Sequence, residues 1–194
     1  MNCLELFSGT GSVGKVCKEL GWNVVSVDLE LPATHECDIM DFDYKQYPKD
    51  YFSVVWASPP CTEYSAMNYC RPEKTPNIEL ANKLVLKALE IINYFQPEVW
   101  YLENPQTGTL KNQLFMKDLP YYDVDYCMYD NPIRKRTRIW TNKKDWKNLL
   151  CDKNCGSIKD GKHLSFRYMN IKGQNRLHLR YRIPPDLIYS LFLD

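Results

Sequence analysis

The stretch Cys3-Leu-Glu-Leu-Phe-Ser-Gly-Thr-Gly-Ser12 decides the fold, because it reads as a buried strand, a glycine-rich turn and the start of a helix. The strand is expected from Cys3 to Phe7, and the helix from about Ser12 to Leu20, where Gly21 ends it. Glycine lets a backbone approach a ligand closely, and the amino end of a helix favours negative charge. This succession predicts an α/β sheet with a ligand site at the carboxyl ends of its strands.

Short apolar runs alternate with helical patterns along the chain, which predicts a mostly parallel sheet covered by helices. Apolar residues recur at helical spacing from about Asn77 to Phe95, and a short final helix is expected after Pro184-Pro185. The further strands are expected at Asn23 to Asp28, Phe52 to Ala57, Glu98 to Glu103, Tyr122 to Tyr129 and Arg138 to Thr141. The last two of these strands are predicted to form an antiparallel hairpin toward the C-terminus.

The 194 residues, of which 44% are hydrophobic, are enough for one core and few for two, so a single domain over 1–194 is expected. The net charge of +1 hides an asymmetry: residues 1–133 contain 10 Lys and Arg against 19 Asp and Glu, whereas residues 134–182 contain 15 against 3. Residues 142–182 are also poor in periodicity, which predicts a basic, loop-rich excursion. Such a segment favours a nucleic-acid partner, although a solvated basic surface is the alternative.

The eight cysteines are expected to be free thiols in a reducing compartment, because no signal peptide precedes Cys3. No apolar run approaches the length that crosses a bilayer. We therefore expect an intracellular, cytoplasmic protein that is not secreted and has no membrane partner.

Two acids follow the glycine-rich turn at positions that suit a nucleoside cofactor. Asp28 ends the second expected strand, where an acid commonly holds the hydroxyls of a ribose. Asp38, in Cys37-Asp38-Ile39, follows a possible third strand and could lie by an adenine ring. Each acid taken alone is better explained as a solvated loop residue or a helix cap. Together with the glycine-rich turn they favour a nucleoside cofactor.

The tetrapeptide Ser58-Pro59-Pro60-Cys61 follows the apolar strand that ends at Ala57. Two prolines stiffen the turn and fix the direction of the next side chain, at the sheet edge where open α/β folds bind ligands. Cysteine is usually a buried structural residue. A cysteine presented by a rigid turn beside a cofactor loop instead suits thiolate chemistry, which needs an exposed and electropositive setting.

Four motifs occur in a fixed order: Phe7-Ser-Gly-Thr-Gly11, Ser58-Pro-Pro-Cys61, Leu102-Glu-Asn-Pro105 and Arg136-Thr-Arg138. This ordered set, over about three quarters of the chain, resembles the cytosine-C5 DNA methyltransferases, and it is far more specific than any one motif. The resemblance implies a Rossmann-like fold that uses S-adenosyl-L-methionine to methylate C5 of cytosine in nucleic acid, with DNA as the expected substrate. Compact proteins of this kind are typical of viruses and phages, which implies the cytoplasm of a host cell.

The resemblance also implies roles for single residues. Cys61 is the nucleophile that adds to C6 of the pyrimidine, and Glu103 holds and protonates N3. Arg136 and Arg138 steady the flipped base and phosphate, although Arg134 has the same spacing and leaves the register of the pair open. The implied cofactor site combines the glycine-rich turn, the two acids with their neighbours and the rigid turn: Phe7, Ser8, Gly9, Thr10, Gly11, Asp28, Leu29, Asp38, Ile39 and Pro60.

The chain departs from the family pattern at single positions, among them Pro105, and in its length. Pro105 stands where the family usually has Val, which changes the backbone but leaves the acid in place. Members that read a DNA sequence carry a separate recognition domain, for which residues 142–182 are too few. Low specificity, a second protein subunit that supplies recognition, and an RNA or free-nucleotide substrate are all open. A catalytically inactive subunit that binds nucleic acid or regulates a partner is a further alternative.

Three residues of the basic excursion could bind a metal. Cys151, Cys155 and His163 have the spacing Cys-x3-Cys-x7-His, and thiolates and imidazole are the ligands that zinc prefers. A metal could hold together a segment that is too polar to form a core. His178 and Cys127 are both open as a fourth ligand. Three unrelated polar loop residues are the alternative, and the spacing alone favours that alternative.

Overall fold

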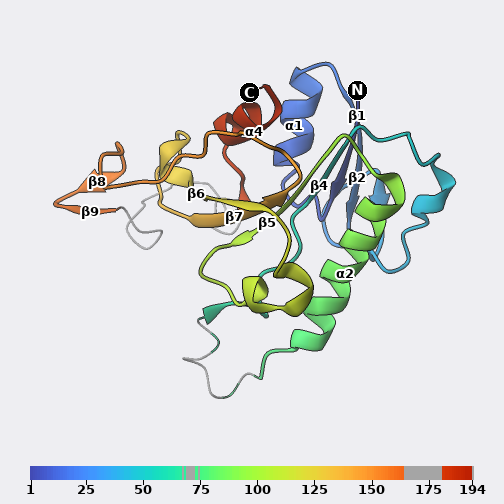
Figure 1. Ribbon diagram of the computed structural model, residues 1–194, viewed down its shortest axis with the longest axis horizontal. Coiled ribbons are helices and arrows are strands. Elements are labelled where there is room, and N and C mark those ends of the chain that lie inside the picture. The colour runs from blue at the N-terminus through green and yellow to red at the C-terminus, as the bar shows by residue number, and fades with distance from the viewer. Residues whose placement is uncertain (67, 69–72, 74, 164–180, 194) are drawn as a thin grey trace.

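The computed structural model describes residues 1–66, 68, 73, 75–163 and 181–193 (Figure 1). Its main sheet contains, side by side, β3 (His35–Glu36), β2 (Asn23–Asp28), β1 (Asn2–Leu6), β4 (Val54–Ala57), β5 (Val99–Pro105), β7 (Arg136–Thr141) and β6 (Tyr121–Asp125). Strands β1 to β5 are parallel, whereas β7 is antiparallel to both β5 and β6. The predicted mostly parallel sheet and the predicted antiparallel pair are therefore confirmed.

The strand predicted at Tyr122 to Tyr129 is shorter than expected. β6 ends at Asp125, and Tyr126–Met128 form a 3-10 helix, η5. Asp125 pairs with Arg136, the first residue of β7, so the ladder between the two strands ends there, and the Asp125 side chain accepts hydrogen bonds from Arg134 and from the Cys151 backbone N–H. The chain therefore turns after Asp125, and the pairing partner β7 begins at Arg136, two residues before the predicted start.

Helices cover both faces of the sheet. α1 (Ser12–Glu19) and α4 (Pro185–Leu193) lie side by side and pack on one face, and α2 (Ile78–Phe95) packs on the other (Figure 1). The long helix agrees with the prediction because residues at both of its ends cap it. Asn77 Oδ1 accepts a hydrogen bond from the Leu80 backbone N–H, and Gln96 adopts a left-handed conformation with φ 44° directly before Pro97.

The strand order creates a switch point between β1 and β4. From β1 the chain passes through α1 to β2 and β3 on one side, and then returns to β4 on the other side of β1. The loops that follow β1 and β4 therefore diverge at the carboxyl edge of the sheet, which leaves a crevice between them. The glycine-rich turn follows β1 and the turn with Cys61 follows β4, so the topology brings these two segments to the same crevice.

The excursion predicted at 142–182 is described for residues 142–163 and 181–182. There the described residues form β8 (Ile158–Lys159) and β9 (Lys162–His163), a short antiparallel hairpin at the opposite end of the molecule from β2 (Figure 1). The single-domain organisation of 1–194 stays a prediction. The other short elements are η1 (Tyr44–Gln46), η3 (Leu110–Asn112) and η4 (Leu114–Met116).

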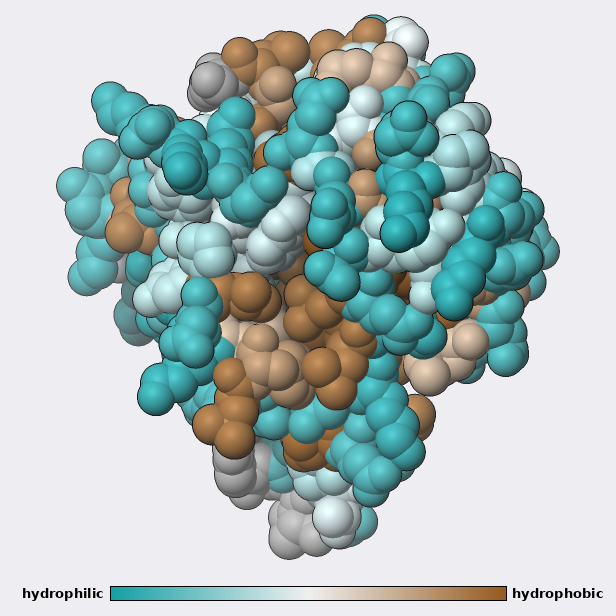
Figure 2. Space-filling view, turned by 45° about the vertical axis from the view of Figure 1, so that its right-hand side comes forward, coloured by the Kyte–Doolittle hydropathy of each residue, from teal (hydrophilic) through white to brown (hydrophobic). Residues whose placement is uncertain are grey.

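One face of the molecule carries both hydrophobic and hydrophilic side chains. On the face in Figure 2, hydrophobic side chains gather in the middle and hydrophilic ones surround them. Among the described residues, none of the helices combines the length and the apolar character that a bilayer crossing requires.

Candidate active site at the carboxyl edge of the sheet

A pocket of about 340 Å³ lies at the carboxyl ends of the central strands, and both Cys61 and Glu103 line it. Cys61 is half-buried, whereas Glu103 is only 6% exposed. This volume suits a small-molecule ligand or cofactor. The pocket brings together most of the predicted site: Phe7, Ser8, Gly9, Thr10, Asp28, Leu29, Pro60, Cys61 and Glu103, with Glu5, Ser12, Glu30, Leu31, Ser58, Pro59, Thr62, Pro105, Lys135, Tyr181 and Ile183 completing its lining.

The turn after β1 has the backbone conformation that its glycines allow. Gly9 and Gly11 have φ of 52° and 66°, and Phe7 has φ 55°, which is uncommon for a residue with a side chain. The Gly9 backbone N–H donates to Asp28 Oδ2 at 2.7 Å. Asp28 Oδ1 accepts hydrogen bonds from the backbone N–H groups of Glu30 and Leu31. Asp28 thus joins the turns after β1 and β2 on one wall of the pocket.

Glu5 is a buried acid beside this turn. Its two carboxylate oxygens accept hydrogen bonds from the backbone N–H groups of Val13 and Gly14, at 3.1 and 3.0 Å, in the first turn of α1. Burial raises the pKa of Glu5 to about 7, although the two N–H groups and nearby lysines act in the opposite direction. A Cβ atom at Gly14 would lie 2.7 Å from Glu5 Oε2, so any larger residue there would displace this buried carboxylate or α1.

Hydrogen bonds fix the turn that presents Cys61. Asn104 Nδ2 donates to the Pro59 carbonyl at 2.9 Å, which connects the end of β5 to this turn. Trp56 Nε1 donates to Ser58 Oγ at 2.9 Å. In the described part of the chain, Asn104 Oδ1 is the one buried side-chain oxygen or nitrogen without a hydrogen-bond partner. The proline-rich turn is therefore held both by its own stiffness and by the neighbouring strand.

Two donors orient the carboxylate of Glu103. Tyr126 Oη donates to Glu103 Oε1 at 3.0 Å, and Lys135 Nζ donates to the same oxygen at 3.1 Å. Burial raises the pKa of Tyr126 well above its usual range, and the charges of Glu103 and Cys61 add to the rise. Because Cys61 acts electrostatically on Tyr126, the thiol, the phenol and the carboxylate belong to one electrostatic cluster.

The predicted arginines lie outside the lining of the pocket. Arg138 makes a two-pronged ion pair with Asp123, at 2.7 and 2.8 Å, and its guanidinium lies 3.5 Å from the centre of the Tyr121 ring. Arg134 makes a similar pair with Asp125. The side chain of Arg136 is exposed at the start of β7. Arg138 therefore has a structural setting, and Lys135 is the cation beside Glu103.

Three predicted cofactor residues also lie outside the lining. Ile39 is buried in the core on the α2 face, and Asp38 Oδ1 accepts a hydrogen bond from the Met40 backbone N–H at 2.9 Å. Gly11 precedes α1 and lines a neighbouring groove of about 430 Å³ that shares Glu5 with the pocket.

Sequence reasoning missed Glu5, Lys135 and Tyr126. A lone acid inside the apolar strand Cys3-Leu-Glu-Leu was a visible signal for Glu5. Lys135 stands among several basic residues, and nothing in its spacing distinguishes it. Tyr126 was placed within a predicted strand, and its approach to Glu103 depends on the turn that ends β6.

The fold and the pocket define a class of protein: an α/β protein with a crevice at the carboxyl ends of its strands that a half-buried cysteine and a buried glutamate both line. Residues 1–113 match the family described as C-5 cytosine-specific DNA methylase. The chain is also 36% identical to a Probable DNA (cytosine-5)-methyltransferase of Frog virus 3 (isolate Goorha), with 98% of each chain covered. The chain therefore belongs to the C-5 cytosine-specific DNA methylase family.

Solved structures share the fold at low sequence identity. The Entamoeba histolytica methyltransferase EhMeth has a TM-score of 0.57 at 16% identity, covering 78% of this chain and 55% of its own. A DNA modification methyltransferase encoded within an E. coli prophage has a TM-score of 0.55 at 15% identity, covering 73% of this chain and 46% of its own. The chain thus spans about half the length of these structures, and the predicted methyltransferase fold is confirmed.

Proposed function

We propose that this chain transfers a methyl group from S-adenosyl-L-methionine to C5 of cytosine in DNA through a covalent adduct with Cys61. One observation carries the proposal: Cys61 and Glu103 line one pocket together with the glycine-rich turn and Asp28. A nucleophile, an acid and a nucleoside-binding wall are the three parts that this reaction requires.

The donor set of the pocket fits S-adenosyl-L-methionine. Asp28 would hold the ribose hydroxyls, the backbone of the glycine-rich turn would lie against the cofactor, and Phe7 offers an aromatic face. The cofactor supplies an electrophilic methyl group on a positively charged sulfur. Asp38 and Ile39 contribute from outside the pocket lining, by supporting the loop that follows β3.

The chemistry of the chain itself begins at Cys61. Its thiolate forms a bond to C6 of the cytosine while N3 receives a proton from the carboxylic acid of Glu103, which converts the ring into an enamine that is nucleophilic at C5. After C5 has taken the methyl group, a base removes the C5 proton. The C6–sulfur bond then breaks, the thiolate leaves, and N3 returns its proton to Glu103.

The surroundings of Glu103 suit the role of a positioned acid. In the described part of the chain, the side-chain hydrogen bonds of Glu103 go to Oε1, from Tyr126 and Lys135. These two donors fix the orientation of the carboxyl group, and its burial excludes water from the proton-transfer step. Lys135 thereby takes a place that the sequence had suggested for an arginine, beside the flipped base.

DNA is the proposed polymer, because residues 134–182 carry 15 basic residues against 3 acidic ones. The exposed Arg136 stands at the start of β7, outside the lining of the pocket, and we assign it to a phosphate contact. The cytosine is extruded or single-stranded when it enters the pocket. We also propose an intracellular site in the cytoplasm of a host cell, because the 36% identical relative belongs to a virus. A second subunit that supplies sequence recognition stays a prediction.

A covalent trap tests the proposal. DNA that contains 5-fluorocytosine cannot lose its C5 substituent as a proton, so the enzyme, incubated with S-adenosyl-L-methionine, should remain attached and run as a larger species on a denaturing gel. Cys61→Ala should abolish the adduct, whereas Cys37→Ala, which removes a half-buried thiol outside the pocket, should keep it.

Transfer of a tritiated methyl group to DNA, RNA and free nucleotide, assayed in parallel, identifies the substrate. Incorporation into DNA supports the proposal. Incorporation into RNA or nucleotide alone refutes the DNA assignment, and no incorporation and no adduct would refute the activity.

A further inference from the structure

Four possible metal ligands from three separate segments converge beside η5. Cys127 lies on η5, Cys151 and Cys155 belong to the loop before β8, and His163 ends β9. The three sulfur atoms and the imidazole nitrogen all lie within 4.8 Å of one another. The sequence indicated three of these residues and left the fourth open between His178 and Cys127. The structure places Cys127 in the cluster, and His178 lies outside the described residues.

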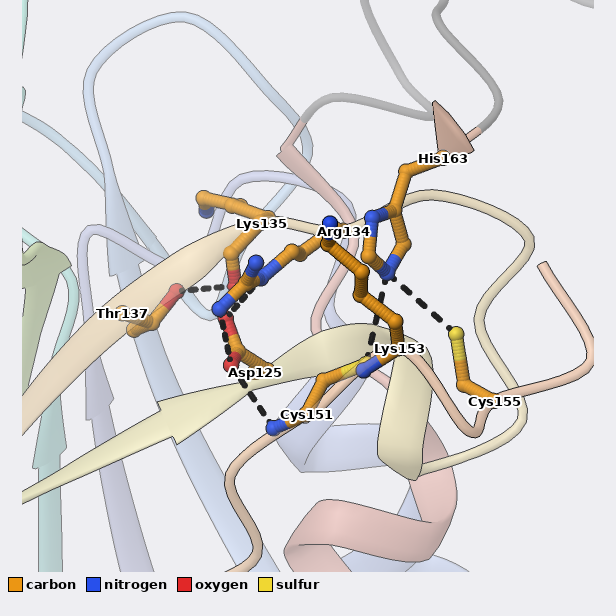
Figure 3. A network of polar contacts seen from close by, with 8 residues as sticks. All are labelled: Asp125, Arg134, Lys135, Thr137, Cys151, Lys153, Cys155 and His163. Atoms are coloured by element: carbon orange, nitrogen blue, oxygen red, sulfur yellow. Dashed lines mark hydrogen bonds and ion pairs between the residues drawn. The ribbon is translucent and has the colours of Figure 1, made fainter. Parts of the chain in front are cut away.

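The distances agree with a tetrahedral zinc site. His163 Nε2 lies 3.3 Å from Cys151 Sγ and 3.4 Å from Cys155 Sγ (Figure 3). Zinc bonds of about 2.3 Å to sulfur and about 2.0 Å to nitrogen, at tetrahedral angles, would separate such ligands by roughly 3.6 Å. Three thiolates and one imidazole are a common ligand set of structural zinc, and four protein ligands leave no open position for a catalytic water.

Neighbouring groups hold the ligands in place. The Lys153 backbone N–H donates to Cys151 Sγ at 3.4 Å, and the Cys151 backbone N–H donates to Asp125 Oδ2 at 2.9 Å. Asp125 is in turn paired with Arg134. Figure 3 shows the contacts that run from Arg134 through Asp125 to Cys151, and through His163 to Cys155. Three thiolates around Zn²⁺ carry a net negative charge, so a nearby arginine stabilises the occupied site.

We infer that Cys127, Cys151, Cys155 and His163 bind one structural zinc ion, which attaches the basic excursion to the segment that carries Tyr126 and Lys135. Tyr126 directly precedes Cys127, and Lys135 directly follows Arg134; both donate to Glu103. The ion would therefore hold the Glu103 donors in position from outside the pocket. The inference concerns metal content and does not depend on the proposed methyl transfer.

Metal analysis of the purified full-length protein tests the inference. Elemental mass spectrometry, after reconstitution with zinc and gel filtration, should find one zinc ion per chain. Cys155→Ser and His163→Ala should lose the ion, whereas Cys37→Ser, a half-buried cysteine outside the cluster, should keep it.

Two further measurements keep the test decisive if a variant does not fold. His163→Cys preserves four ligands and should retain zinc. Wild-type protein loaded with Co²⁺ should show the intense visible bands of a tetrahedral cobalt thiolate. Wild-type protein without zinc after reconstitution, a disulfide within the cluster, or bound iron in place of zinc would each overturn the inference.

Discussion

Replacing the buried Glu5 by Gln should remove a pH dependence from the stability of the protein. Burial raises the pKa of Glu5 from 4.5 to about 7 in the folded chain. The folded state therefore binds this proton more tightly than the unfolded state. The stabilisation from the protonated Glu5 is fully present below about pH 4.5 and is lost as the pH rises through 7.

The size of the effect follows from the shift in pKa. The difference between 4.5 and about 7 corresponds to roughly 3 kcal/mol of unfolding free energy, since one pKa unit is worth about 1.4 kcal/mol. Gln matches Glu in shape, and like the protonated acid it offers one good acceptor to the N–H groups of Val13 and Gly14. Between pH 5 and 8.5 the wild-type protein should therefore lose roughly 3 kcal/mol relative to Glu5→Gln.

Urea unfolding of the cofactor-free protein at several pH values, followed by circular dichroism, measures this difference directly. Other titrating groups contribute equally to both proteins, so the difference between the two curves isolates Glu5. Glu36→Gln removes an exposed acid on β3 and should leave the pH dependence of the wild-type protein unchanged. Parallel curves for wild type and Glu5→Gln, or a wild-type protein that gains stability relative to the variant as the pH rises, would refute the reasoning.

Three other substitutions have defined outcomes. Tyr126→Phe removes a buried donor to Glu103 and should lower both the unfolding free energy, by about 1.5–3 kcal/mol, and the rate of methyl transfer, by roughly tenfold or more. Arg138→Lys loses the two-pronged pair with Asp123 and should cost about 1–2 kcal/mol in urea unfolding. Gly14→Ala places a methyl group against a buried carboxylate and should cost about 1–3 kcal/mol, measured in the same way.

These outcomes have matched controls. Tyr121→Phe changes a phenol on β6, the strand that precedes η5, and it should leave the methyl-transfer rate unchanged because no hydrogen bond joins this phenol to Glu103 among the described residues. Lys83→Arg, in an exposed pair with Glu79 on α2, should change the unfolding free energy by less than about 0.5 kcal/mol. An unaltered rate in Tyr126→Phe, or wild-type stability in Arg138→Lys or Gly14→Ala, would contradict the corresponding contact.

Local patterns were enough to predict the main strands and helices and the motifs around Cys61 and Glu103. The apolar run of β1, its glycine-rich turn and the long amphipathic helix α2 depend on residues that are neighbours in the chain. The ordered motifs around Cys61 and Glu103 indicated the family, and the comparisons confirm it. The prediction for β6 failed beyond Asp125, because the strand ends where its ladder with β7 ends and where Asp125 contacts Cys151, 26 residues away in the chain.

The sequence by itself determined the main strands and helices and the motifs that carry Cys61 and Glu103, since short-range periodicity and motif order encode them. Only the tertiary structure decided which donors reach Glu103, that Arg138 is held by Asp123, and that Cys127 joins Cys151, Cys155 and His163. Each of these contacts joins segments that are far apart in the chain. Whether two such segments meet in space depends on the strand order and on where each strand ends. Spacing along the sequence carries no direct record of either.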